Sequence, residues 1–219
     1  MTYVKASVRR PAGNPGNGIQ PKDQLVIYDV DDILSFPQRN EAGVVIEDDI
    51  VMKEGRYAIG IYLTPGTAEI SSNSDGETDA EGYTPSIKFN HPGNQQEIRE
   101  FKTNWLTKKC IVVLRYCSGK PADLIGTPCN PCKLSVSYTG SNESNTNELT
   151  FTQISKGDDI AIYQGTDTLE EPVAVVEAKA TDITYQTDGQ YQLSAGEAKI
   201  AGVTGGSHGS VITLSLIHI

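Results

Sequence analysis

Basic residues are in short supply in this chain. Its 219 residues include 28 Asp or Glu but only 18 Lys or Arg, so the formal net charge is −10 at pH 7. A groove that holds nucleic-acid phosphates needs the opposite balance, because its affinity comes largely from cationic side chains. The composition therefore argues against a protein that grips DNA or RNA.

Long apolar runs are also lacking, and none approaches the roughly 20 residues that a membrane-spanning helix needs. The first 17 residues carry Arg9, Arg10 and several Pro and Gly residues but no apolar centre, so they do not resemble a signal peptide. Residues 11–21 are especially rich in Gly and Pro. We expect residues 1–24 to form a flexible arm that awaits a partner, and we expect no membrane association.

Histidine is scarce, and the three histidines, His91, His208 and His218, are scattered along the chain. No Gly-x-Ser-x-Gly motif accompanies them. The glycine-rich segment 202–209 lacks the Lys-Ser/Thr ending of a phosphate-binding loop. Because no acid, base and nucleophile come together, the sequence predicts a protein without enzymatic activity.

Cysteine occurs only four times. Cys129 and Cys132 have the two-residue gap of a zinc knuckle, but Cys110 and Cys117 are six residues apart, and Cys110 opens a predicted buried strand. Zinc binding, a disulfide and reduced structural thiols all remain open. We favour reduced thiols, because a buried thiol behaves as a small apolar side chain.

Two acidic runs, at residues 29–32 and 75–81, could in principle offer oxygen ligands to calcium. Neither has the spacing of an EF-hand loop, and a solvated acidic surface explains both. We therefore predict no metal and no cofactor.

Only one segment, residues 94–106, has a convincing helical pattern. Asn94 and Glu97 have the spacing of a capping box at its start. Ile98, Phe101 and Trp105 fall at i, i+3 and i+7, so they form one apolar stripe that predicts packing against a sheet.

The other ordered segments have the composition and alternation of β-strands. They are residues 24–29, 33–36, 43–46, 57–63, 67–71, 85–91, 110–116, 133–138 and 149–154. Two polar stretches between strands, 72–84 and 139–147, are predicted as long hairpin loops. The fold class is therefore mainly β, a sandwich or barrel flanked by one helix.

The amino-acid composition changes near residue 170, where aromatic residues become rare and Ala, Gly and Thr become common. We predict a β domain over residues 25–169 and the start of an incomplete β-rich module over residues 170–213, with strands at 182–185 and 190–193. The last six residues, 214–219, back-translate to a sequence that resembles the end of a transposase sequencing adapter. We expect them to be foreign to the protein.

Several motifs together resemble the major tail tube proteins of tailed bacteriophages, particularly those that infect gut Bacteroidales. The resemblance covers residues 25–168. It is carried by residues 44–51 (VVIEDDIV), 57–67, 79–82 (DAEG), 87–93 (IKFNHPG), 97–105 (EIREFKTNW), 126–131 (GTPCNP), 156–160 (KGDDI) and 163–165 (YQG).

This resemblance implies a virion structural protein of the phage tail, assembled in the host cytoplasm. Its partners would be further copies of itself, joined by sheet edges into hexameric rings, and other phage tail proteins. DNA would pass through the lumen without specific binding, since acidic walls repel phosphates. We expect rings to stack through the terminal arms and the predicted loop 72–84. The candidate contact residues are Asn73, Asp75, Glu77, Asp79 and Glu81.

Other functions remain open. A carbohydrate- or surface-binding β-sandwich of a phage or bacterium would use exposed tyrosines such as Tyr83, Tyr138 and Tyr185 as stacking platforms. A secretion-system tube subunit would share the geometry of the phage protein. Assembly into rings would favour a tube subunit, whereas glycan binding by a stable monomer would favour the sandwich.

Overall fold

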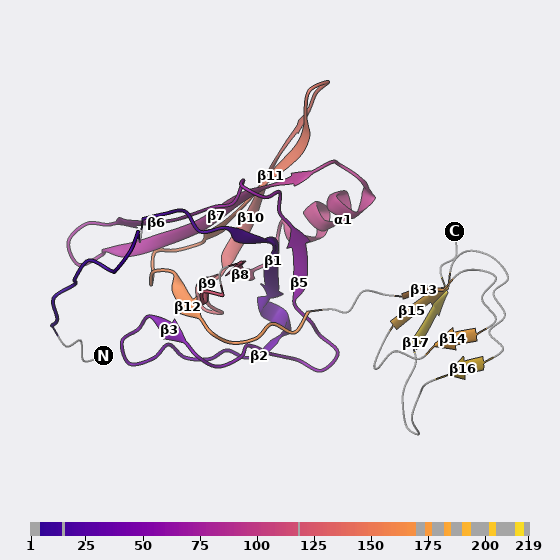
Figure 1. The fold of residues 1–219 in the computed structure, drawn as a ribbon, viewed down its shortest axis with the longest axis horizontal. Coiled ribbons are helices and arrows are strands. Elements are labelled where there is room, and N and C mark those ends of the chain that lie inside the picture. Colours follow the sequence, from indigo (N-terminus) through magenta and orange to yellow (C-terminus); the bar gives the residue numbers. More distant parts are fainter. Residues whose placement is uncertain are drawn as a thin grey trace. The chain divides into compact units, whose positions relative to one another are not determined.

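The computed structural model describes residues 5–14, 16–117 and 119–169, together with five short strands between residues 174 and 216. The chain divides into two units, Met1–Leu169 and Glu170–Ile219, and each is described by itself. The first unit is mainly β with one α-helix among its described residues (Figure 1), so the predicted fold class is confirmed at this level.

Twelve strands and two short helical segments make up the described part of the first unit. The strands are β1 (Pro21–Asp29), β2 (Ile33–Ser35), β3 (Val45–Ile46), β4 (Val51–Met52), β5 (Ile59–Tyr62), β6 (Glu69–Asp75), β7 (Gly82–Pro92), β8 (Cys110–Tyr116), β9 (Ala122–Ile125), β10 (Cys132–Gly140), β11 (Asn145–Gln153) and β12 (Ala161–Tyr163). The helical segments are the 3-10 turn η1 (Val30–Asp32) and the helix α1 (Gln96–Trp105).

Ten of these strands form one sheet with two parts. One part has the order β5-β1-β8-β9-β12-β3, and the other has the order β10-β11-β7-β6. The two parts meet at a single residue pair, Cys110 in β8 and Cys132 in β10. Neighbouring strands are antiparallel throughout, except that β12 and β3 run parallel. The remaining pair, β2 and β4, forms a separate two-stranded ribbon.

The first hydrophobic core draws on both parts of the sheet, which therefore enclose it. Its buried members are Leu25, Ile27, Ile61, Leu63, Ile87, Phe89, Ile98, Cys110, Val112, Leu114, Ile125, Cys132, Leu134, Leu149 and Phe151.

A second core lies on the opposite face of β1, β8 and β9. Its buried members are Val26, Tyr28, Ile46, Ile50, Ala58, Ile111, Val113, Ala122, Leu124, Ala161 and Tyr163. Because successive side chains point to opposite faces of a strand, β1 sends Leu25 and Ile27 to the first core and Val26 and Tyr28 to the second. This burial on both faces explains why residues 25–28 (LVIY) form an uninterrupted apolar run.

The helix lies where the sequence predicts it, but its start differs. Its N-cap is Gln95, which makes no side-chain capping bond, so the predicted capping box is wrong. Asn94 is engaged elsewhere: its side-chain oxygen accepts a hydrogen bond from Lys102 Nζ at 3.0 Å, and its carbonyl accepts one from Arg99 Nε at 2.9 Å. These contacts occupy Asn94 and leave the cap position to Gln95.

The predicted stripe faces the first core. Ile98 is buried, and Phe101 and Trp105 are partly buried against the same cluster. The rings of Phe101 and Trp105 stack with their centroids 5.6 Å apart.

Both predicted polar loops are largely strand, so their predicted extents are wrong. β6 and β7 pair from Glu69↔Lys88 to Asp75↔Gly82 and leave only residues 76–81 as a loop. β10 and β11 pair out to Gly140↔Asn145 and leave residues 141–144. Beyond the core both faces of a hairpin are exposed to solvent. The alternation of apolar and polar residues that marks a strand is therefore absent there, although backbone pairing continues.

The described strands of the second unit are β13 (Ala174–Val176), β14 (Asp182–Thr184), β15 (Gln190–Leu193), β16 (Gly202–Thr204) and β17 (Thr213–Leu216). β13, β15 and β17 pair in parallel, and so do β14 and β16. The strands expected at 182–185 and 190–193 correspond to β14 and β15. Tyr185, His208 and His218 lie outside the described residues.

No helix in the described part of the chain is long and apolar enough to cross a membrane.

Candidate assembly surface

The part of the sheet with the order β10-β11-β7-β6 is the candidate functional surface, because its outermost strands have open edges. β10 pairs with β11 along one side, while its other side meets β8 only at Cys132. A backbone hydrogen bond of 3.0 Å from Ile154 N to Pro131 O shows which β10 residues direct their N–H and C=O groups toward β11. By the alternation of an antiparallel ladder, Leu134, Val136 and Tyr138 direct their N–H and C=O groups outward. None of the described strands pairs with them.

The opposite edge, β6, is open in the same way. Tyr83 of β7 exchanges two backbone hydrogen bonds of 2.9 Å with Gly157, so its polar groups point away from β6. The same alternation then directs the backbone groups of Ile70, Ser72 and Ser74 outward from the sheet. Within the described residues no strand lies beyond this edge. An open edge is a template for pairing with another chain.

One face of this four-stranded surface is polar apart from Gly82 and Pro92, and it is rich in hydroxyl groups. The register places on it Glu69, Ser71, Asn73, Asp75, Gly82, Thr84, Ser86, Lys88, Asn90, Pro92, Lys133, Ser135, Ser137, Thr139, Thr146, Glu148, Thr150 and Thr152. Lys88 and Lys133 balance Glu69 and Glu148, with Lys88 Nζ 3.3 Å from Glu69, and Asp75 pairs with Lys156 at 3.2 Å. The face is therefore close to neutral although the chain is acidic.

The predicted contact residues gather at the end of the β6–β7 hairpin. Asn73 and Asp75 lie in β6, Glu77 and Asp79 in the loop, and Glu81 just before β7; all five are exposed. The carboxylate of Asp75 accepts hydrogen bonds from Lys156 and from the backbone N–H of Gly76, and these contacts lower its pKa. The structure thus brings these side chains together at one hairpin tip.

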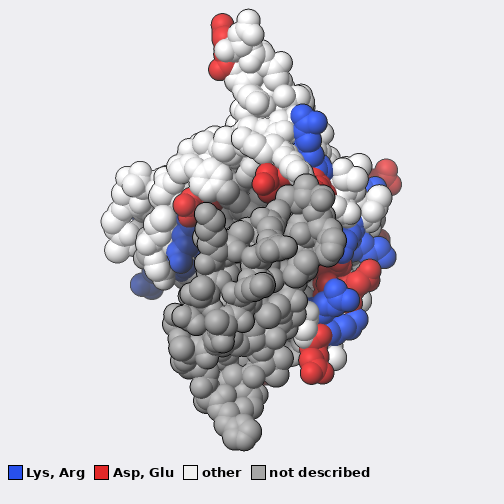
Figure 2. Space-filling model, turned by 90° about the vertical axis from the view of Figure 1, so that its right-hand side faces the viewer, with Lys and Arg blue, Asp and Glu red and all other residues white. Residues whose placement is uncertain are grey.

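A second hairpin, β10–β11, projects from the first unit and was not predicted as a site (Figure 1). Its turn closes through Ser141 N and Ser144 O at 2.7 Å. Glu143 is the sole charged residue between 134 and 147, and Figure 2 accordingly shows a mostly uncharged shaft with acidic atoms at its tip. Because its residues are polar, the outer part of this hairpin was predicted as a loop. The same composition makes its surface hydrophilic.

Lys102 of α1 anchors the base of this second hairpin. Its Nζ donates to the side-chain oxygen of buried Asn147 at 2.6 Å and lies 5.2 Å from the ring centre of Tyr138. The side-chain amide of Asn147 in turn donates to the carbonyl of Gly93. Partial burial and the charge of Arg99 lower the pKa of Lys102. The helix therefore secures the position from which the hairpin projects.

Residues 155–159, which we call the brace, contact the β6–β7 hairpin from one side. Lys156 Nζ lies 3.2 Å from Asp75. Gly157 forms the two backbone bonds to Tyr83, and Asp159 accepts a hydrogen bond from Ser72. No local sequence pattern indicates these contacts, because each joins residues that are more than 70 positions apart in the chain.

The four cysteines are free thiols. Cys110 and Cys132 are buried, and burial raises the pKa of Cys110 to about 12 and that of Cys132 further. Cys117 and Cys129 are exposed. Across the described residues no three metal-ligating side chains form a group that could hold a metal ion.

Comparison with protein-family models, with curated proteins and with solved structures finds no match for this chain.

Proposed function

We propose that this protein is a virion structural protein of the tail tube type, whose copies join edge to edge into rings that stack into a tube. The observation that carries the proposal is the pair of open edges, β6 and β10, on the same four-stranded surface. A sheet that is open on both sides can accept one neighbour on each side. Such head-to-tail contacts close into a ring when the rotation between copies allows it.

Strand direction supports this arrangement. β10, β11, β7 and β6 alternate in direction, so β6 and β10 run opposite to each other. When a copy is rotated about a ring axis, its β10 comes beside the β6 of its neighbour in antiparallel orientation. The ladder pattern of the subunit would continue across the contact.

The hydroxyl-rich face is suited to line a channel for DNA. Tight binding of phosphates requires an excess of Lys and Arg, but on this face Lys88 and Lys133 are balanced by Glu69 and Glu148, and Asp75 is paired with Lys156. DNA would pass without specific binding because the wall offers no net positive charge. The lumen wall was expected to be acidic. The excess of Asp and Glu in the chain would instead lie on other surfaces.

The two hairpin tips are suited to contacts between successive rings, because both are polar and project beyond the core. Replacing Glu77, Asp79 and Glu81 by their amides would leave the sheet edges intact. We expect this variant to form rings but fewer stacked tubes, with electron microscopy as the measurement. Tubes of unchanged length would remove the β6–β7 tip from the proposal.

A carbohydrate-binding function receives less support. Tyr83 and Tyr138 are 41% and 47% exposed. However, the register places Tyr138 level with His91, eight residues along β7 from Tyr83. At the rise of a β-strand this separates the two rings by roughly 26 Å. They therefore do not form one stacking platform.

The test is negative-stain electron microscopy of the full chain over a range of concentrations, with rings or tubes as the expected result. Val136→Pro and Ser74→Pro each remove one outward N–H, from β10 and β6 respectively. Each variant alone should stay monomeric, whereas a mixture should form a one-to-one complex through the two intact edges. A Ser74→Pro variant that dimerises alone would instead indicate β10–β10 pairing.

The matched control is Glu54→Pro. Glu54 is exposed and occupies the second position of the turn closed by Arg56 N and Lys53 O at 3.0 Å, where proline is well accommodated. This variant should assemble like the unmodified chain. Featureless monomers of the unmodified chain under several salt conditions would refute the proposal and make a glycan screen the next step.

A further inference from the structure

The outer part of the β6–β7 hairpin, residues 72–85, has little packing of its own, and we call it the arm. Pairing between β7 and β11 ends at Ser86↔Thr152, so in the arm only β6 and β7 remain paired, as a two-stranded ribbon at the end of the surface. Its residues are polar, apart from Gly76, Ala80, Gly82, Tyr83 and buried Pro85. An isolated two-stranded ribbon is at best marginally stable in water. Something other than a hydrophobic core must therefore hold the arm in place.

The brace supplies contacts along the length of this arm. Asp159 bonds Ser72, Gly157 bonds Tyr83, and Lys156 pairs with Asp75. Because these contacts lie at three positions on the two strands, they restrict bending of the ribbon as well as its separation from the body. The two backbone bonds between Gly157 and Tyr83 form an isolated antiparallel bridge to β7.

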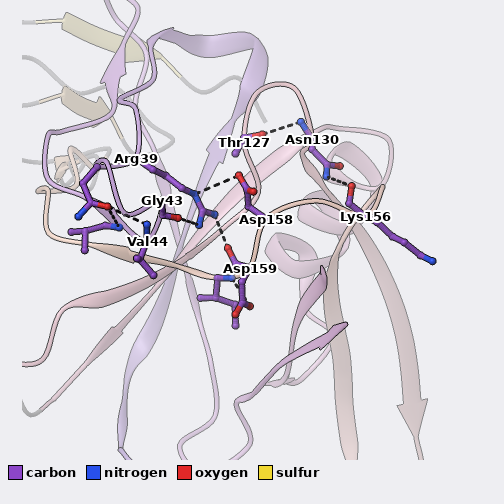
Figure 3. Close-up of polar contacts among 11 residues, drawn as sticks. Arg39, Gly43, Val44, Thr127, Asn130, Lys156, Asp158 and Asp159 are labelled. Atoms are coloured by element: carbon purple, nitrogen blue, oxygen red, sulfur yellow. Dashed lines mark hydrogen bonds and ion pairs between the residues drawn. The ribbon is translucent and has the colours of Figure 1, made fainter. Parts of the chain in front are cut away.

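The brace is itself held by two side chains from distant parts of the chain (Figure 3). Arg39, with a side chain only 13% exposed, donates from one guanidinium nitrogen to the carbonyl of Asp159 at 2.6 Å and from another to the carbonyl of Gly43 at 3.0 Å. It also lies 3.9 Å from the carboxylate of Asp158. Arg39 therefore links the end of the brace to the loop before β3.

Asn130 holds the other end of the brace. Its side-chain amide donates to the carbonyl of Ser155 at 2.8 Å, and its side-chain oxygen accepts from the N–H of Ser155 at 3.0 Å. Its own backbone is fixed by reciprocal bonds with Thr127, of 3.0 and 3.1 Å. Both ends of the brace are thus tied by side chains that do not touch the arm.

We propose that the brace fixes the direction of the arm before subunits meet, and that Arg39 and Asn130 are positioning residues for assembly that act through it. This inference rests on the proposed function, since it takes the β6 edge and its tip as assembly contacts. A contact surface that is already ordered loses less conformational freedom when it binds. Loosening the brace should therefore weaken assembly without removing any contact residue.

The experiment compares the full chain with Arg39→Met and Asn130→Ala in two measurements. Hydrogen exchange of the monomer reports the order of residues 72–85, and sedimentation over a concentration series gives the critical concentration for assembly. We expect amide exchange in the arm to rise about tenfold or more while exchange in β1 and β8 is unchanged, because the arm can open locally. The critical concentration should rise by about the same factor.

A charge exchange tests the ion pair between the arm and the brace, Asp75 with Lys156. Asp75→Lys and Lys156→Asp should each raise arm exchange and the critical concentration, while the double variant should recover both. A purely structural loss at either position would not be rescued by the second change. The control is Arg56→Gln, which removes an exposed ion pair with Asp32 of 3.5 Å, away from the arm.

The outcomes separate the inference from the function on which it rests. If the unmodified chain forms no rings at any concentration, the proposed function fails and the inference falls with it. If rings form but the Arg39 and Asn130 variants assemble at unchanged concentration, the inference alone fails. Unchanged exchange in residues 72–85 would likewise overturn it, because the brace would then not order the arm.

Discussion

Replacing Asp167 by alanine should destabilise the first unit strongly, because its carboxylate is buried and shared by two partners. The carboxylate of Asp167 is 6% exposed and pairs with Arg115 Nε. It also accepts a hydrogen bond of 2.6 Å from the hydroxyl of Tyr28, which belongs to the second core. The substitution would therefore leave a buried phenol and a partly buried guanidinium without this shared partner.

The size of this loss of stability depends on the contacts that Arg115 keeps after the substitution. Removing one partner of a buried ion pair costs about 3–5 kcal/mol. Arg115 is 27% exposed and keeps its bond to the carbonyl of Gly165 at 2.7 Å, so part of its desolvation is relieved. We therefore expect the free energy of unfolding to fall by about 3 kcal/mol, near the lower end of that range.

Chemical denaturation followed by fluorescence measures this loss, because Trp105 is the single tryptophan and packs against the first core. The control is Glu69→Gln, since the side chains of Glu69 and its partner Lys88 are 70% and 45% exposed and lie 3.3 Å apart. An exposed pair contributes less than about 1 kcal/mol. Equal losses for the two variants would refute the reasoning, because burial would then not decide the cost.

Three further predictions follow from burial. Phe151→Ala should lower the free energy of unfolding by about 3–5 kcal/mol in the same assay, since Phe151 is fully buried. Burial raises the pKa of Asp123, so its protonated form stabilises the fold below the unfolded pKa and this contribution is lost as pH rises through the folded pKa. Asp123→Asn should therefore gain stability relative to the unmodified chain as pH rises, and a constant difference in denaturation midpoints would contradict this. Thiol labelling followed by mass spectrometry should modify exposed Cys129 in the folded protein and buried Cys132 only after denaturation.

The sequence determined the fold class because the core-facing residues follow local rules. Strand β8 is predicted over the same residues that the structure shows, since an apolar run bounded by polar residues needs no knowledge of its neighbours. The stripe of Ile98, Phe101 and Trp105 likewise follows from the helical period alone. Wherever burial repeats with the period of an element, the sequence carries the signal.

Tertiary structure alone decided the surface on which the proposed function depends. The hairpins at 72–84 and 139–147 look like loops because their strands gain backbone hydrogen bonds without burying apolar side chains. The open edges exist because of strand order, which no local pattern encodes. The brace contacts arm residues that lie more than 70 positions away in the chain, and Arg39 and Asn130 hold its two ends. Polar contacts between such distant segments have no period, so only the folded chain reveals them.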